Sequence, residues 1–234
     1  MDKAKGSKKK IKITMDGPYE VSGDVPLKQM DIGANDRGES VDWVEGKSYE
    51  KPEEPYHLCR CGHSRTKPFC DGSHDDAGFC GREHANRPPY EKHAQVLEGP
   101  GCSLLDDQTL CVGARFCDVG ETVWGYVEKS DNPENVQRAI EEACKCPSGR
   151  LTVVDSDGKR IEPNLKPEIG VVEDPSQNCR GPLWVKGGIE IEGANEEKYE
   201  VRNRVALCRC GESKNQPYCD GSHYNCPHMQ GLDE

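Results

Sequence analysis

The sequence predicts a β-rich α+β protein in which two similar outer halves flank a different, mixed unit. One observation is a near-repeat, because residues 58–74 read LCRCGHSRTKPFCDGSH and residues 207–223 read LCRCGESKNQPYCDGSH, with 12 of 17 positions identical. A second is that the similarity extends upstream, where GPYEVSGDVPL at 17–27 resembles GPLWVKGGIEI at 181–191. The third is composition: hydrophobic residues make up only 33% of the chain, which holds 14 cysteines. We therefore expect bound metal to contribute to folding.

Length and charge limit the function classes. The 234 residues are enough for one large or two small domains. A net charge of -11 argues against nucleic acid as a partner, and the one basic run, Lys3–Lys12, is expected to be a solvated tail. No apolar run is long enough to cross a membrane, and no apolar secretory segment is present. We predict a cytoplasmic protein, in which 14 cysteines indicate metal ligands rather than disulfides.

Each outer half is expected to contain a short β-hairpin followed by a Cys-rich segment. In the first half, residues 1–95, the hairpin is predicted to turn at Gly23-Asp24. In the second half, residues 166–234, it is predicted to turn at Gly187-Gly188. The apolar alternation that leads into the second Cys-rich segment predicts a further strand there, on Tyr199, Val201 and Val205.

The middle unit, residues 96–165, is predicted to combine a helix with a hairpin. Ser130 or Asp131 is the expected N-cap, and Pro133 suits the first turn. The apolar face of this helix consists of Val136, Ala139, Ile140 and Ala143. Pro147 and Gly149 end it, and the segment 151–162 reads as a hairpin that turns at Asp157-Gly158.

The repeated segments share the pattern C-x-C-x2-S-x3-P-x-C-D-G-S-H. Its candidate ligands are Cys59, Cys61, Cys70 and His74 in the first copy, and Cys208, Cys210, Cys219 and His223 in the second. Three sulfurs and one imidazole suit either a zinc ion or a [2Fe–2S] cluster. The C-x-C spacing is unusual for zinc, whose cysteines are commonly two to four residues apart. The shared serines, Ser64 and Ser213, are expected either to donate to a cluster sulfur or to shape a turn.

This pattern resembles the CDGSH iron–sulfur family at every defining position in both copies. The resemblance implies a [2Fe–2S] cluster at each motif, held by three Cys and one His. It also implies a fold like the intertwined dimers of the family, which have a β-rich cap. Because both copies lie in one chain, the resemblance predicts a monomer that contains an intramolecular pseudo-dimer. The resemblance does not cover the middle unit.

The middle unit has its own cysteine pattern. The segment CVGARFC provides Cys111 and Cys117, and the predicted helix leads to Cys146 followed by Pro147. This order resembles a small divergent mono-cluster ferredoxin family over about 60 residues, which implies a ferredoxin-like α+β insert. The pattern lacks the middle Cys of a C-x2-C-x2-C run. Three thiolates suit a [3Fe–4S] cluster, or a [4Fe–4S] cluster completed by a non-Cys ligand or by Cys102 or Cys144; a zinc site and buried thiols remain alternatives.

These patterns predict a multi-cluster iron–sulfur protein that transfers electrons or delivers clusters under redox or pH control. No acid–base set is evident, so we expect a carrier rather than an enzyme, with no catalytic residues. The alternatives are a structural zinc protein and an enzyme that uses an open iron of the middle cluster. The negative charge predicts a redox partner protein with a basic docking surface. The cysteines outside the motifs (Cys80, Cys179, Cys226) are expected to be buried, and the other histidines (His57, His63, His84, His93) to be exposed or in loops.

Overall fold

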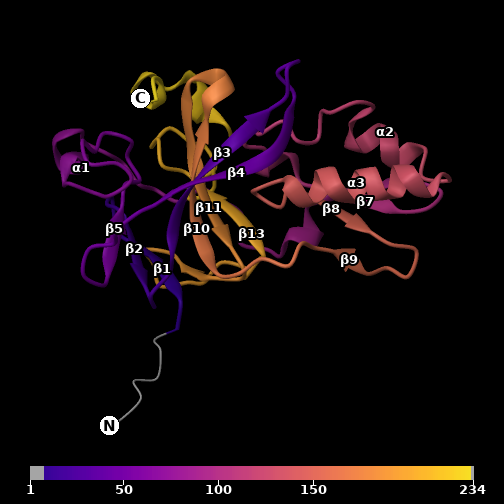
Figure 1. The fold of residues 1–234 in the computed structure, drawn as a ribbon. Helices are drawn as coiled ribbons and strands as arrows, with labels where there is room; N and C mark the ends of the chain where they lie inside the picture. The colour runs from indigo at the N-terminus through magenta and orange to yellow at the C-terminus, as the bar shows by residue number, and fades with distance from the viewer. Residues whose placement is uncertain (1–7, 233–234) are drawn as a thin grey trace, which may run out of the picture.

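The computed structural model describes residues 8–232 and shows a β-rich α+β protein built on three sheets (Figure 1). The first sheet has the order β12-β1-β2-β5 and comprises β1 (Lys10–Ile13), β2 (Tyr19–Ser22), β5 (Tyr56–Leu58) and β12 (Glu190–Glu192). The second has the order β13-β11-β10-β3-β4 and comprises β3 (Leu27–Ala34), β4 (Ser40–Ser48), β10 (Glu168–Asp174), β11 (Cys179–Lys186) and β13 (Arg204–Leu207).

The two outer halves exchange strands: the first half contributes β3 and its hairpin partner β4 to the second sheet, and the second half contributes β12 to the first sheet. The first half supplies β1, β2 and β5 to the first sheet, and its β3 crosses to the second sheet. The second half supplies β10, β11 and β13 to the second sheet, and its β12 crosses to the first. Each crossing strand pairs in parallel with the first strand of the other half, with Ile191 opposite Ile11 and Gln29 opposite Val171. The exchange gives the two sheets matching strand orders, apart from the extra edge strand β4.

The largest core cluster is shared between the halves. It includes apolar side chains of the first half on β1 and β2, such as Ile11 and Val21, and of the second half on β10 and β11, such as Val171 and Val185; all four are at most 1% exposed. Side chains in a strand alternate between its two faces, which is why every second residue of β1 and β2 is buried. Within this arrangement each half completes the apolar core of the other.

The middle unit forms the third sheet together with two helices. Its strands have the order β6-β7-β8-β9, with bounds Gln95–Glu98, Ser103–Asp106, Leu151–Val154 and Arg160–Ile161. Helices α2 (Thr122–Glu128) and α3 (Pro133–Lys145) pack with this sheet around a separate core that includes Leu104, Val123 and Ala139. In Figure 1 this unit lies on one side of the two larger sheets, and the short helix α1 (Ser73–Asp76) lies on the other.

Short 3-10 turns connect these elements near the Cys-rich segments: η1 (Tyr90–Lys92), η2 (Gln108–Leu110), η3 (Pro175–Gln177), η4 (Ser222–Asn225) and η5 (Pro227–Met229). Residues 8–232 contain no helix long and apolar enough to cross a membrane.

The structure confirms several expected elements. The hairpin that turns at Asp157-Gly158 is formed by β8 and β9, with Val153 opposite Ile161. Helix α3 begins at Pro133, and its apolar residues Ala139 and Ala143 are buried. Its N-cap is Asn132, whose side chain accepts a hydrogen bond from the amide of Glu134, rather than Ser130 or Asp131.

The hairpins predicted at Gly23-Asp24 and Gly187-Gly188 are wrong. At each of these turns the chain leaves one sheet and enters the other, so β2 does not pair with β3 and β11 does not pair with β12. The hairpins of the outer halves are β1–β2 and β10–β11, one strand earlier. Local turn signals do not show whether the following strand returns or crosses.

Two further expectations need correction. The predicted strand through Tyr199 and Val201 begins only at Arg204, and Val201 is 56% exposed. Of the basic run Lys3–Lys12, the part from position 3 to position 7 lies outside the described residues. In the described part, Lys10 begins β1, and its ammonium lies 2.6 Å from the carboxylate of Glu192. This part is an ordered strand rather than a solvated tail.

The first glycine of each crossing turn, Gly23 or Gly187, leaves no room for a side chain. Gly187 has a φ of 71°, and a Cβ there would lie 2.5 Å from the backbone of Lys166 and Pro167, immediately before β10. Gly158 has a similar φ of 78°, but a Cβ there would meet no atom within 4 Å. We expect Gly187→Ala to lower the free energy of unfolding by about 2–4 kcal/mol, and Gly158→Ala by only about 1 kcal/mol. Anaerobic denaturant unfolding measures both; equal losses would show that the crossing turn is not sterically restricted.

Candidate metal centres

The two Cys-rich motifs have the same local structure. In each, the amide of the first Cys donates to the carbonyl of the motif Pro at 2.8 Å: Cys59 to Pro68, and Cys208 to Pro217. The motif Gly before the Ser has a φ near 88° in both copies, which only glycine adopts readily, and it begins the short helical turn that carries the His. The sequence repeat therefore corresponds to a repeated fold.

The four candidate ligands of each motif lie as two pairs. In the first motif, the Sγ atoms of Cys59 and Cys61 are 3.8 Å apart, and Cys70 Sγ lies 3.5 Å from His74 Nδ1. In the second motif the matching distances are 3.5 Å for Cys208 and Cys210, and 3.3 Å for Cys219 and His223. Within residues 8–232, no group of three or more His, Cys, Asp or Glu side chains is arranged to hold a single metal ion.

Backbone amides point at the sulfurs of these pairs. The amide of His63 donates to Cys61 Sγ at 3.4 Å, and that of Glu212 donates to Cys210 Sγ at 3.4 Å. The thiol of Cys61 lowers the pKa of Cys59 to about 6, and the same contact raises the pKa of Cys61. In the second motif, Cys210 likewise lowers the pKa of Cys208, to about 7, so the environment stabilises one thiolate in each C-x-C pair before metal binds.

In each motif, the Asp after the third Cys and the Ser after the second Cys form hydrogen bonds within the loop rather than with the ligands. Asp220 accepts from the amide and hydroxyl of Ser222 at 3.0 and 2.6 Å, and from the amide of Lys214 at 2.9 Å. Ser213 Oγ donates to the carbonyl of Tyr218 at 2.6 Å, as Ser64 Oγ does to that of Phe69. The alternative that these serines form a turn is confirmed.

The three cysteines predicted for the middle site line one cavity. The other residues that line it are Val112, Gly113, Ala114, Arg115, Phe116, Pro147, Arg150 and Leu151, beside Cys111, Cys117 and Cys146. Burial raises the pKa of Cys117 to about 12, and Cys146 contributes in the same direction. The two alternative ligands lie elsewhere: Cys102 is 4% exposed in the core of the middle unit, and Cys144 faces Arg204.

Comparison with known families agrees with this geometry. Residues 16–75 and 180–224 match the family described as iron-binding zinc finger, CDGSH type, and residues 97–156 match the family described as divergent 4Fe-4S mono-cluster. The chain contains two CDGSH regions flanking a divergent 4Fe-4S mono-cluster domain. No curated protein and no solved structure matches the chain significantly. The matched regions include all eleven predicted ligands; which of them bind iron stays a prediction.

The two CDGSH sites lie against each other. A Cβ on Gly62 would be 2.8 Å from the carbonyl oxygen of Cys210, and a Cβ on Gly211 would be 2.8 Å from that of Cys61. Both glycines have a φ near 82°. The two C-x-C segments therefore approach each other backbone to backbone, and side chains at these positions would separate the sites.

The two CDGSH sites differ in solvent access. Cys219 and His223 are each 2% exposed, whereas Cys70 is half-buried and the His74 side chain is 18% exposed. Burial, with a smaller contribution from Arg209, lowers the pKa of His223 to about 4. The Cys–His pair of the motif is thus more exposed to solvent in the first half than in the second.

The mono-cluster domain closes the second CDGSH site. A Cβ on Gly221 would be 3.5 Å from the carbonyl oxygen of Cys111. Tyr224 Oη donates to Asp174 at 2.7 Å and lies 2.9 Å from Arg115 Nη1, and Arg115 also lies 2.8 Å from the Asp174 carboxylate. The three ligand sets therefore form a row, with the second CDGSH site between the other two.

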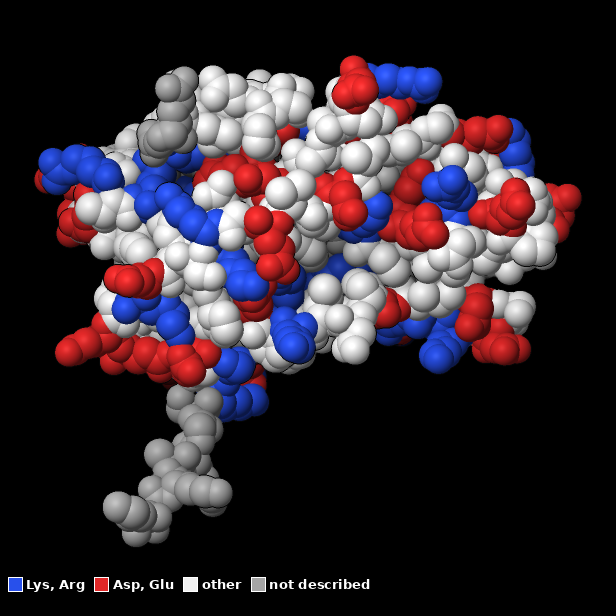
Figure 2. Space-filling model, viewed as in Figure 1, with Lys and Arg blue, Asp and Glu red and all other residues white. Residues whose placement is uncertain are grey.

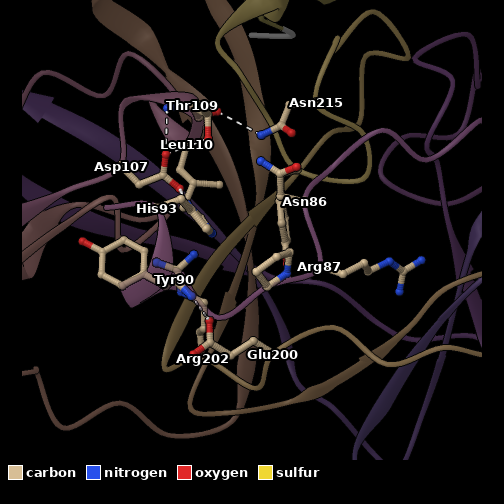
Figure 3. A pocket seen from close by; sticks show the side chains of 12 residues that line it. Asn86, Arg87, Tyr90, His93, Asp107, Thr109, Leu110, Glu200, Arg202 and Asn215 are labelled. Atoms are coloured by element: carbon tan, nitrogen blue, oxygen red, sulfur yellow. Dashed lines mark hydrogen bonds and ion pairs between the residues drawn. The ribbon is translucent and has the colours of Figure 1, made fainter. Parts of the chain in front are cut away.

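A polar pocket lies where these loops meet (Figure 3). His93 Nδ1 is 2.9 Å from the Oδ2 of Asp107, which is 3% exposed. Asp107 caps the turn η2, which ends at Cys111, and Asn215 of the second motif donates to the carbonyl of Thr109 at 3.0 Å. His93 lies in a turn, as expected for a surface or loop histidine, and it is also a partner of the loop that carries Cys111.

The remaining predictions are confirmed in part. Cys179 and Cys226 are buried, but Cys80 is exposed. His57, His63 and His84 are exposed.

Two residues at the sites were not predicted from the sequence: Arg60 and Arg209, the middle residues of the two C-x-C pairs. Both guanidinium groups are buried and donate to backbone carbonyls, those of Gly81 and Gly181 respectively. The signal in the sequence that could have identified them is that an Arg occupies the same position in both motifs.

We expect the first CDGSH site to lose its iron–sulfur cluster before the second when the pH falls to about 5. Protons compete with iron for the imidazole nitrogen, and burial keeps His223 neutral until the pH approaches about 4. The buried site also excludes water and chelators. Visible absorbance followed over time at each pH should therefore decay in two phases.

Two matched variants assign these phases. His74→Cys should remove the fast phase, because a thiolate replaces the accessible imidazole, and His223→Cys should leave the fast phase in place. Loss of colour in a single phase in all three proteins would contradict the difference between the sites.

Proposed function

We propose that this chain is an electron carrier with two [2Fe–2S] centres and a third, [3Fe–4S] or [4Fe–4S], centre. The row of three ligand sets carries the proposal. The C-x-C segments of the two CDGSH sites pack through Gly62 and Gly211, and the Cys111 loop packs on Gly221. A bound iron–sulfur cluster supplies one-electron chemistry. Contiguous sites in one chain suit the exchange of electrons between two external partners.

The chain's own residues hold and screen such groups. In each CDGSH site, two cysteine sulfurs lie together, the third lies beside the imidazole nitrogen Nδ1, and a backbone amide donates to the second sulfur of the C-x-C pair. The division of each ligand set into two pairs supports a two-iron cluster, in which each iron takes two protein ligands. A single zinc ion would instead require all four ligands around one point.

The strand exchange supports the intramolecular pseudo-dimer. Both parallel contacts, β1 with β12 and β10 with β3, join strands of the two halves within one chain. Each half thus serves as the dimer partner of the other. On this basis we propose that the protein is a monomer. The 14 cysteines, which suit metal ligands better than disulfides, support the proposal that it acts in the cytoplasm.

The open first site favours a second candidate function, cluster delivery. The His74 side chain is 18% exposed, and Cys70 is half-buried. An acceptor protein can approach these two ligands directly, which is not possible at His223 and Cys219, each 2% exposed. Delivery would therefore use the first CDGSH site alone.

One experiment distinguishes the two functions. The anaerobically reduced protein is mixed with a one-electron acceptor, and in parallel with an apo-ferredoxin that lacks its cluster. For electron transfer we expect the acceptor to be reduced while iron and sulfide stay with the donor. Transfer of iron and sulfide to the apo-ferredoxin, abolished by His74→Cys and unaffected by His223→Cys, would favour delivery. Zinc in place of iron at the CDGSH sites would contradict both.

The charge of the protein predicts how it meets a partner. The net charge is -11, and on the face shown in Figure 2 acidic and basic side chains are interspersed. We expect the rate of electron transfer to a basic acceptor such as cytochrome c to fall as salt rises beyond about 0.1 M, where the Debye length is about 10 Å. An acidic acceptor is the control and should react faster as salt rises. A rate to cytochrome c that does not change with salt would contradict electrostatic steering.

A further inference from the structure

The cavity of the mono-cluster domain offers three thiols and no fourth donor for iron. Of the side chains that line it, Cys111, Cys117 and Cys146 alone can ligate iron, and the polar groups besides them are Arg115 and Arg150. The guanidinium of Arg115 is engaged outside the cavity, with Asp174 and Tyr224. Among the described residues that line the cavity wall, Arg150 is therefore the charged side chain that remains beside the thiols.

Arg150 is held firmly in this wall. The residue is 9% exposed, and its Nε and Nη2 atoms donate to the two carboxylate oxygens of Asp106 at 2.6 and 2.8 Å. The Trp124 indole donates to the same carboxylate at 3.1 Å, and its ring lies 5.3 Å from the Arg150 guanidinium. Arg150 and Cys111 line the same cavity. The Asp106 carboxylate, which does not line the cavity, offsets the cost of burying this cation and holds it in the wall beside the thiols.

The sequence shows where the missing ligand would stand. Ala114 occupies the central position between Cys111 and Cys117, at which a C-x2-C-x2-C run would have its second Cys. Ala114 lines the cavity and is 7% exposed. A thiol at this position would reach the same space as the three that are present.

We propose that Arg150 takes the place of a fourth ligand, so that the mono-cluster domain holds a three-iron cluster and does not take up a fourth iron. The inference rests on the proposed function and specifies its third centre. Arg150 acts as a positioning residue: its positive charge opposes entry of a ferrous ion and compensates the negative charge of three thiolates and sulfide. The same charge favours the reduced cluster and should raise its reduction potential.

The step that Arg150 opposes is chemically simple. A reduced [3Fe–4S]⁰ cluster combines with one Fe²⁺ ion to give [4Fe–4S]²⁺, with no further electron transferred. Dithionite supplies the reducing electron, and ferrous salt supplies the iron. The oxidised three-iron cluster is paramagnetic, whereas the oxidised [2Fe–2S] clusters and the [4Fe–4S]²⁺ cluster are not, so EPR spectroscopy follows the third centre alone.

The test compares the wild-type protein with Ala114→Cys, Arg150→Ala and Arg150→Lys, all purified anaerobically. Arg138→Ala is the matched control, because it removes an arginine that is 65% exposed on α3 and lies outside the cavity lining. Each protein is reduced with dithionite, incubated with excess ferrous salt, desalted and reoxidised, and EPR and iron analysis follow. A redox titration monitored by EPR gives the potential of the third centre.

We expect the wild type, Arg138→Ala and Arg150→Lys to keep the EPR signal and about seven irons per chain. Ala114→Cys should lose the signal and contain about eight irons. Arg150→Ala should lose the signal only after incubation with ferrous salt, and before that incubation its third centre should have a lower potential. Arg150→Lys keeps the positive charge, so it distinguishes an effect of the lost charge in Arg150→Ala from an effect of disturbed folding.

Three results would overturn the inference. The first is a wild-type protein with about eight irons and no signal from the oxidised third centre, which would leave the proposed electron carrier intact. The second is an Arg150→Ala protein that behaves as Arg138→Ala does. The third is a third site without iron, which would overturn the three-centre function as well.

Discussion

The exchange of β3 and β12 between the two large sheets is the constraint on which the rest of the structure depends. Each half contributes three strands to one sheet and a crossing strand to the other, where β3 is joined by its hairpin partner β4, so side chains of both halves form the core between the sheets. A chain with 33% hydrophobic residues gains most by burying them in one shared core rather than in two small ones. The exchange also fixes the two CDGSH motifs beside each other, because β5 and β13 lead directly into them.

The inserted domain breaks the symmetry that the exchange creates. By itself, the repeat would give two equivalent sites. The loop from Cys111 to Cys117 packs on the turn that carries His223, and Arg115, Tyr224 and Asp174 join the two loops. His74 lies instead beside the β1–β2 turn of its own half, because a Cβ on Gly17 would be 3.6 Å from its Nε2, and its side chain stays 18% exposed. The helix α1 that carries His74 lies on the side away from the insert (Figure 1). The same four ligands thus have different access to water, protons and partners.

Buried arginines accompany all three sites. Arg60 and Arg209 lie within the C-x-C pairs, and Arg150 lies in the wall of the middle cavity. Arg204 is 1% exposed and donates to the carbonyls of Ala143 and Cys146 at the end of α3, at 2.5 and 3.0 Å. A buried guanidinium is costly unless its donors are satisfied, and here backbone carbonyls and carboxylates satisfy most of them, although the Nε of Arg60 has no hydrogen-bond partner among the described residues. These cations offset the negative charge that thiolates bring into the protein interior, in a chain whose net charge is -11.

The sequence by itself determined the candidate ligands, the three-part organisation and the resemblance to iron–sulfur families, because cysteine spacing and turn residues are local properties. It also determined helix α3 and the hairpin β8–β9, which depend on neighbours along the chain. Only the tertiary structure decided that the turns at Gly23 and Gly187 cross between sheets, since a crossing depends on which distant strand offers a free edge. It alone gave the different burial of His74 and His223, the pairing of His93 with Asp107, and the position of Arg150. These contacts join residues tens to hundreds of positions apart, and no local pattern encodes them.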